Sequence, residues 1–111
     1  MSDVWTEDQA DLLKYSLRNI LATITNILRY KSDKFYLATP FNHGYKQFNV
    51  EGNNLEEMVF KATELLKSKN INWVNLETAE GLPILSIYLE AGPTIIINDV
   101  VTDKTICSIL L

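Results

Sequence analysis

The sequence is poor in the residues that build covalent and metal cross-links. Its 111 residues include one cysteine, Cys107, and one histidine, His43. A single cysteine excludes an intramolecular disulfide framework, and one cysteine with one histidine falls short of the ligand set of a closed structural zinc site. We therefore expect neither a metal nor another cofactor. A chain with a single thiol is typical of a reducing compartment, which predicts the cytoplasm.

Glycine, proline and long apolar runs are also scarce. Four glycines and three prolines are too few for a fibrous or linker-rich chain. No uncharged run approaches the roughly 18 residues that span a bilayer, and residues 1–8 are acidic where a secretory signal would be basic and then apolar. Hydrophobic residues make up 47% of the chain and charged residues 22%, which excludes disorder. We expect one soluble domain over residues 1–111.

Sequence motifs of known chemistry are missing as well. The chain has no glycine-rich phosphate loop and no Gly-x-Ser-x-Gly nucleophile elbow. Cys107 lies in a predicted strand, where a buried thiol is usually inert, and its one candidate base, His43, lies in a distant loop. We therefore predict that the chain is not an enzyme. An enzymatic alternative would depend on His43 as a general base.

Two stretches show helical periodicity. The first begins at a capping box of Thr6 and Gln9 and continues to about Tyr30. Its two overlapping apolar seams are wider than one sheet face requires, so that one seam could face a partner, although burial of both is the alternative. The second helix, expected over 55–69 after an Asn54 cap, has a one-sided stripe that is typical of a helix covering a sheet.

Six segments are predicted strands, joined by short connections that imply antiparallel neighbours. They are residues 34–39, 45–50, 71–77, 84–90, 94–101 and 105–111. We predict an α+β fold, a two-layer sandwich in which two helices pack on one face of a mainly antiparallel sheet of about six strands, in the order α-ββ-α-ββββ.

The last predicted strands are apolar on both faces. The run of residues 94–97, Thr-Ile-Ile-Ile, lacks the alternation of a strand with one wet face. Two helices on one side would leave the other face of the sheet open, which predicts that a homodimer or another partner covers it. The alternative is a monomer in which the two helices flank opposite faces.

Residues 29–48 concentrate aromatic and basic side chains. Six of the eleven aromatic residues lie here, and four basic residues stand against one acid, Asp33. Rings interleaved with lysines could stack bases and contact phosphates, although strand propensity alone also favours aromatic residues. Trp73 is either a core anchor or an interface hot spot, and Trp5 could pack as a lid on the first helix. The candidate binding residues are Tyr36, Phe41, His43, Tyr45, Lys34, Lys46 and Trp73.

The leading functional prediction follows by elimination. It is a small non-catalytic protein-binding module of the inhibitor, immunity or adaptor type, forming a homodimer through apolar sheet surface or the first helix. A net charge of -4 and a pI near 4.9 argue against unspecific binding to DNA or to an anionic membrane. The alternative is a ligand or single-stranded nucleic-acid binder that uses the aromatic and basic hairpin of residues 29–48.

Overall fold

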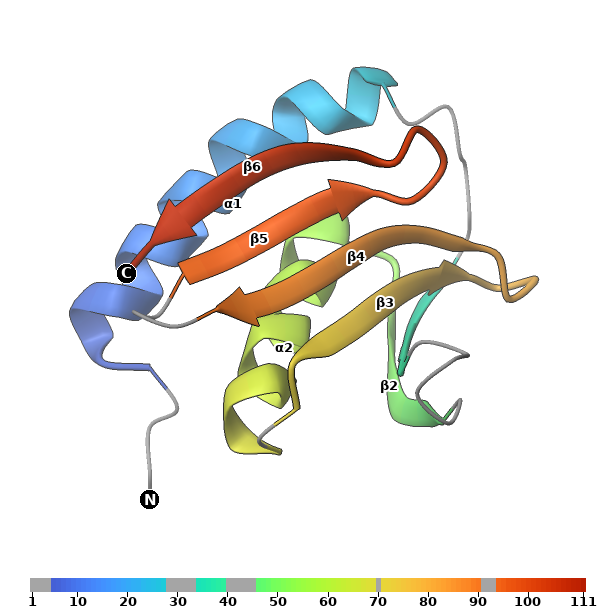
Figure 1. The fold of residues 1–111 in the computed structure, drawn as a ribbon, viewed down its shortest axis with the longest axis horizontal. Helices are drawn as coiled ribbons and strands as arrows, with labels where there is room; N and C mark the ends of the chain where they lie inside the picture. Colours follow the sequence, from blue (N-terminus) through green and yellow to red (C-terminus); the bar gives the residue numbers. More distant parts are fainter. Residues whose placement is uncertain (1–4, 28–33, 40–45, 70, 91–93) are drawn as a thin grey trace.

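The computed structural model describes residues 5–27, 34–39, 46–69, 71–90 and 94–111, with only the backbone for 21–27 and 49. Two helices and six strands follow in the predicted order α-ββ-α-ββββ (Figure 1). They are α1 (Glu7–Ile27), β1 (Phe35–Ala38), β2 (Gln47–Gly52), α2 (Leu55–Ser68), β3 (Trp73–Thr78), β4 (Pro83–Glu90), β5 (Thr94–Asp99) and β6 (Lys104–Leu110).

The six strands form one sheet in the order β2-β1-β3-β4-β5-β6, and every neighbouring pair is antiparallel. Strands β3 to β6 are a simple meander. The hairpin of β1 and β2 joins the meander with β1 innermost, because α2 carries the chain from β2 across to β3. The two edges of the sheet are therefore β2 and β6.

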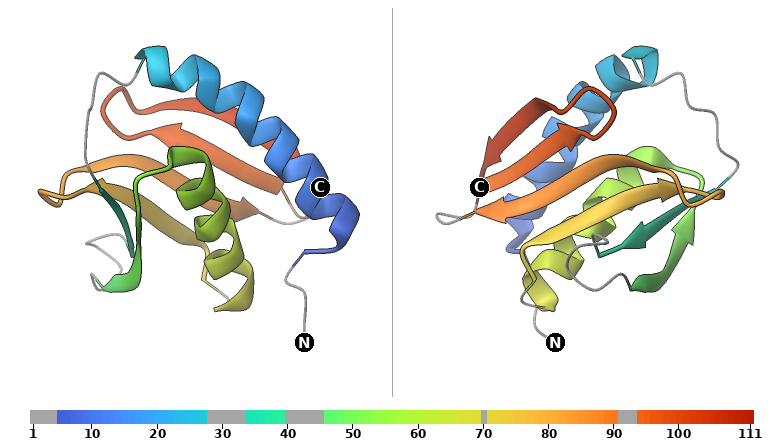
Figure 2. Two further views of the ribbon diagram at one scale, coloured as in Figure 1. Left: turned by 180° about the vertical axis from the view of Figure 1, so that it is seen from behind. Right: turned by 45° about the vertical axis from the view of Figure 1, so that its right-hand side comes forward.

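Both helices lie on the same face of the sheet, as the views from front and back agree (Figures 1 and 2). Helix α2 packs under β1 to β4, and α1 lies beside α2 and contacts β6. The two-layer sandwich is thus confirmed, and the alternative with helices on opposite faces is wrong. We call the other side of the sheet, over which no described helix lies, the open face.

The core fills the space between the helices and the sheet because each element turns one apolar side inward. Leu13 and Leu17 of α1 are fully buried, and four residues of α2 meet them and the sheet. Alternation does the same for the strands, so that Ile95 and Ile97 are fully buried on the helix face. Truncating one such side chain to alanine typically costs about 2–5 kcal/mol. The α2 residues are Met58, Val59, Ala62 and Leu66.

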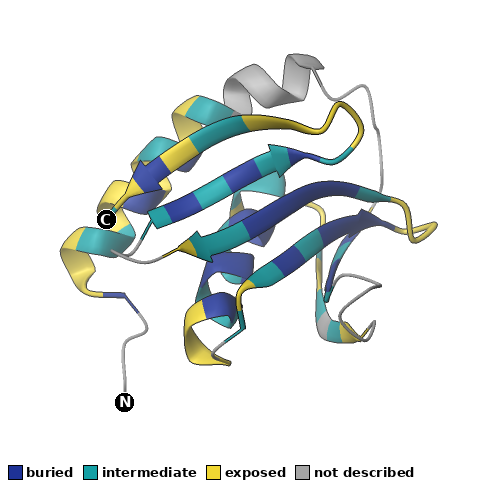
Figure 3. Ribbon diagram, viewed as in Figure 1, coloured by how far each residue is buried: buried dark blue, intermediate teal, exposed yellow. Residues whose placement is uncertain are grey.

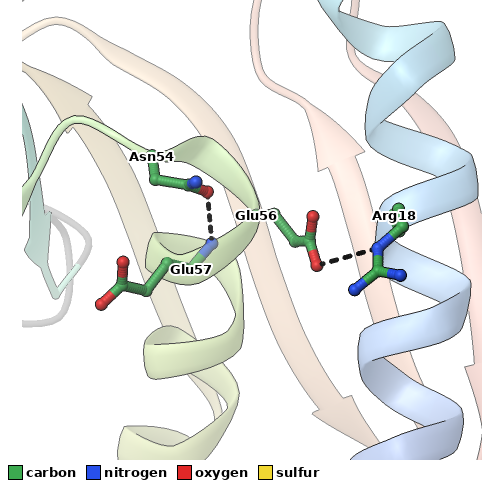
Figure 4. A network of polar contacts seen from close by, with 4 residues as sticks. All are labelled: Arg18, Asn54, Glu56 and Glu57. Atoms are coloured by element: carbon green, nitrogen blue, oxygen red, sulfur yellow. Dashed lines mark hydrogen bonds and ion pairs between the residues drawn. The ribbon is translucent and has the colours of Figure 1, made fainter.

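The helix starts follow the capping signals in the sequence. The Gln9 amide N–H donates to Thr6 Oγ1 at 3.2 Å, and the Thr6 amide donates to Gln9 Oε1 at 3.2 Å, which completes the capping box. At α2, the Glu57 amide donates to Asn54 Oδ1 at 3.0 Å (Figure 4). The Glu57 carboxylate pairs with Lys61 Nζ at 3.1 Å, one turn further along the helix.

Trp5 packs differently from the lid that the sequence suggested. Its ring is 4% exposed, its Nε1–H donates to Thr63 Oγ1 of α2 at 3.3 Å, and Lys67 Nζ lies 4.6 Å from the ring centre. An indole needs both apolar cover and an acceptor for its N–H, and α2 supplies both. Trp5, two residues before α1, is therefore tied to the second helix.

Candidate functional site

Strand pairing arranges the side chains of the open face in rows that cross the sheet. One row, which we call the apolar row, runs through four strands: Trp73, Tyr88, Ile96 and Ser108. The next row, which we call the polar row, consists of Asn75, Ser86, Asn98 and Thr105. Neighbouring residues in a row lie on adjacent strands, about 4.5–5.5 Å apart. Aromatic and amide side chains therefore share the middle of the open face.

Trp73 and Tyr88 form a stacked pair that hydrogen bonds hold in place. The two ring centres are 4.9 Å apart with an interplanar angle of 35°. Trp73 Nε1–H donates to Asn75 Oδ1 at 2.9 Å, and Ser86 Oγ donates to the same oxygen at 2.7 Å. Both rings are half-buried. The indole is thus oriented by the polar row before any ligand arrives, which lowers the entropic cost of binding.

Asn98 completes the polar row with an unsatisfied acceptor. It lies opposite Ser86 in the β4–β5 pairing, and its Oδ1 is buried without a hydrogen-bond partner in the described structure. Leaving a buried acceptor unpaired costs about 1–3 kcal/mol. A donor brought by a binding partner would recover that free energy, which makes Asn98 a candidate contact.

The structure brings only part of the predicted site together. Trp73 and Tyr36 share the open face, since Tyr36 is opposite Glu77 in the β1–β3 pairing. Glu77 and Trp73 are four positions apart on β3, so the two aromatic positions lie about 13 Å apart along the strand direction. Phe41, His43 and Tyr45 fall outside the described residues.

The two predicted lysines lie near the β2 edge, away from the Trp73–Tyr88 pair. Lys34 Nζ is 3.5 Å from Glu51 Oε1, and together with Gly52 and Asn53 they line a shallow hollow. The exposed Lys46 hydrogen-bonds through its amide to Thr39 Oγ1 at 2.7 Å. Among the described residues of the predicted hairpin site, Tyr36 shares the open face with Trp73 at a distance, and Lys34 lies at the β2 edge.

Sequence reasoning missed four residues of this face. Tyr88, Asn75, Ser86 and Asn98 each look ordinary in a strand, and only the pairing of β3 with β4 and β5 places them together. The alternation in β3, with Trp73 and Asn75 two residues apart, was the one available signal that both point to the same face.

The last strands place fewer apolar side chains on the open face than the sequence predicted. Of the three isoleucines in β5, Ile95 and Ile97 face the helices, and Ile96 alone lies on the open face. Thr94 and Asn98 flank it there. The run of residues 94–97 appears two-sided in sequence, but strand alternation gives the open face a mixed surface of rings, amides and hydroxyls.

Cys107 has the properties of a structural thiol. It lies opposite Ile97 and shares the helix face with Ile109, as the alternation predicted. Burial raises the pKa of its thiol from 9.0 to about 11, against a smaller lowering by the backbone of Ile97. Thiolate is therefore scarce near neutral pH, and a nucleophilic role is disfavoured. In the described ranges, no cluster of three or more histidine, cysteine or acidic residues could hold a metal ion.

Neither a protein-family model, nor a curated protein, nor a solved structure matches this chain. Within the part of the chain that the structure describes, no helix has both the length and the apolar character needed to cross a membrane. The geometry of the open face is thus the main ground for a functional proposal.

Proposed function

We propose that this chain is a non-catalytic, cytoplasmic protein-binding module whose open face holds a protein partner. The observation that carries the proposal is the stacked pair of Trp73 and Tyr88, locked by Asn75 on the sheet face that no described helix covers. Tryptophan and tyrosine dominate the binding free energy of many protein interfaces because they bury large rigid surfaces. An inhibitor, an immunity protein or an adaptor would use such a face.

The polar row supports a protein partner of defined geometry. Asn98 Oδ1 needs a donor, and a backbone or side-chain N–H of a partner would supply it next to the apolar row. Contacts of this kind add specificity, since a partner without the donor leaves the acceptor unpaired. The face thus combines an aromatic anchor with one directional contact.

The charges of the open face favour protein over nucleic acid. On β3 and β4 the charged residues that the pairing and alternation place there are both acidic, Glu77 and Glu90. Binding of single-stranded nucleic acid needs basic side chains around its stacking platform. The described lysines of the predicted hairpin site lie at the β2 edge instead, and Lys34 has an ion pair with Glu51. A neutral or basic protein surface fits better.

Site-specific photocrosslinking in the cells that naturally make the chain tests the proposal. The photoreactive residue p-benzoylphenylalanine replaces Tyr88 on the open face or, as the control, Glu57 of α2, whose side chain is 62% exposed. We expect a discrete adduct with another protein from position 88 and none from position 57. Trp73→Ala, with its fold checked by circular dichroism, should abolish that adduct.

Two outcomes would overturn the proposal. One is that position 88 gives no protein adduct beyond those of position 57. The other is binding of a labelled single-stranded oligonucleotide in fluorescence anisotropy that weakens with salt and disappears in Trp73→Ala, which would assign the open face to nucleic acid.

A further inference from the structure

We infer that two copies of this chain pair edge to edge through β6, joining their sheets into one continuous antiparallel sheet with the two α1 helices beside the junction. This inference goes beyond the open-face function and uses the β6 edge, where Ser108 ends the apolar row. It concerns the edge of the sheet and one flank of α1, and it is independent of which partner the open face binds.

The position of α1 exposes one of its flanks beyond the β6 edge. Among the residues that the structure describes, β6 is the last strand of the sheet and pairs on one side only, with β5. α1 contacts β6 and α2, whereas α2 occupies the space under β1 to β4. Figures 1 and 2 show α1 running along β6, with α2 on its inner side. The flank of α1 that faces away from α2 therefore lies over the free edge.

That flank carries one charged residue. The flank facing α2 is marked by Arg18, 3.8 Å from Glu56 (Figure 4), and by Lys14, whose Nζ lies 4.9 Å from the centre of the Phe60 ring. At about 100° per residue, the opposite flank is formed by Leu12, Ser16 and Asn19, with Asp8 one turn before Leu12. Leu12 is 45% exposed.

Charge on the β6 edge is confined to its start. The strand Lys-Thr-Ile-Cys-Ser-Ile-Leu has a single charged residue, at its first position, and Ser108 and Leu110 are exposed (Figure 3). Leu110 is 70% exposed. The register shift between Ile97 and Asn98 lies near the start of β6 and leaves its second half regular. The second half of β6 and the neighbouring α1 flank therefore carry little charge in a chain of net charge -4.

A second copy is the occupant that this surface fits. An antiparallel strand edge is its own complement under a twofold rotation, because donors and acceptors alternate along it. If the two β6 strands overlap fully, the two Lys104 side chains lie at opposite ends of the pair, about 20 Å apart, and do not repel. A strongly charged partner would find no opposite charge there.

The other edge of the sheet has its charge and its register shift within the strand, whereas those of β6 both lie at its start. β2 carries Glu51, which forms an ion pair with Lys34, and its register with β1 shifts between Tyr36 and Ala38. Charged side chains and register irregularities are the usual devices that keep an edge strand from pairing with another chain. Pairing through β6 therefore leaves a doubled sheet whose outer edges are the two protected β2 strands.

Sedimentation equilibrium over about 1–200 μM, a range that brackets micromolar dissociation constants, tests the inference. We expect a species of twice the 12.7 kDa chain mass. Ser108→Lys on the edge and Leu12→Lys on the α1 flank should each raise the dimer dissociation constant about tenfold or more, since like charges then meet across the twofold axis. The control Gln47→Lys, which adds the same charge at the exposed start of β2, should leave it unchanged.

Hydrogen exchange locates the contact independently of the variants. Amides of residues 104–110 should become more protected as the concentration rises, while those of residues 47–52 should not change. A monomer across the whole range would overturn the inference. So would a dimer that survives both lysine variants, and a dimer lost only in Trp73→Ala would place self-association on the open face. None of these results depends on the crosslink from position 88.

Discussion

Asn75 and Asn98 occupy the same row of the open face, yet their side-chain oxygens have opposite surroundings. Asn75 Oδ1 accepts hydrogen bonds from Trp73 and Ser86, whereas Asn98 Oδ1 is buried without a partner in the described structure. We predict that Asn98→Val keeps or raises the free energy of unfolding by up to about 1 kcal/mol, since valine removes an unpaired acceptor and suits a strand. Urea denaturation measures the change.

Asn75→Val is the matched control, with the same substitution two strands away. It leaves the donors of Trp73 and Ser86 unpaired, so the free energy of unfolding should fall by about 1–3 kcal/mol. Equal losses in the two variants would show that Asn98 has a partner in solution, and its part in the proposed binding face would then be withdrawn.

Cys107 gives a pH-dependent prediction. Its folded-state pKa is raised by burial from 9.0 to about 11. In the unfolded chain the thiol loses its proton near pH 9, while the folded chain still holds it. The stabilising contribution of the neutral thiol is therefore complete below pH 9.0 and is lost as the pH rises toward 11.

Comparison with Cys107→Ser isolates this contribution from other pH-dependent contributions to the free energy of unfolding. The free energy of unfolding of the parent chain should decline more steeply between pH 9 and 11 than that of the variant, and the two curves should run parallel below pH 8. The measurement is urea denaturation at each pH. Parallel curves throughout would mean that the thiol is well solvated.

At the scale of single elements, the start of α2 depends on Asn54. Its Oδ1 accepts from the Glu57 amide at 3.0 Å, and no return bond from the Glu57 side chain supports it, because that carboxylate pairs with Lys61. Asn54→Ala should lower the free energy of unfolding by about 1 kcal/mol. The neighbouring Asn53, exposed and outside the cap, serves as the control, and Asn53→Ala should cost much less. Equal costs would contradict the capping role.

The elements themselves were predictable because their signals are local. The Thr6–Gln9 box, the Asn54 cap and the one-sided stripe of α2 each act within a few residues, and all three are confirmed. The neighbours of each strand were not predictable. That β1 lies between β2 and β3, and that Trp5 lies against Thr63, depends on contacts between residues far apart in sequence.

At the scale of the whole molecule, most of the candidate site could not be predicted for the same reason, because strand pairing depends on contacts between residues far apart in sequence. Local composition drew attention to the rings and lysines of residues 29–48, whereas the face in the structure is assembled across β3, β4 and β5 by pairing. Trp73 was predicted because a tryptophan is conspicuous alone. Tyr88 and Asn98 gain their significance only from the strand next to them, which a single sequence does not specify.

The fluorescence of the two tryptophans distinguishes the helix side of the sheet from the open face. Trp5 is 4% exposed beside α2, and Trp73 is half-buried on the open face. We predict that the Trp5→Phe variant, which retains Trp73, is quenched by acrylamide several-fold more steeply than Trp73→Phe, which retains Trp5. Stern–Volmer slopes measure the difference, and circular dichroism verifies that both variants fold.

The concentration dependence of this quenching separates two whole-molecule arrangements. Pairing through β6 leaves the open face uncovered, so the quenching of Trp73 should stay constant from the monomer to the dimer range. Pairing of two open faces would bury Trp73 and reduce its quenching as the concentration rises. A sheet with helices on one side only predicts that the Trp5 indole is shielded and the Trp73 indole is accessible. Equal Stern–Volmer slopes for Trp5 and Trp73 at every concentration would contradict this arrangement.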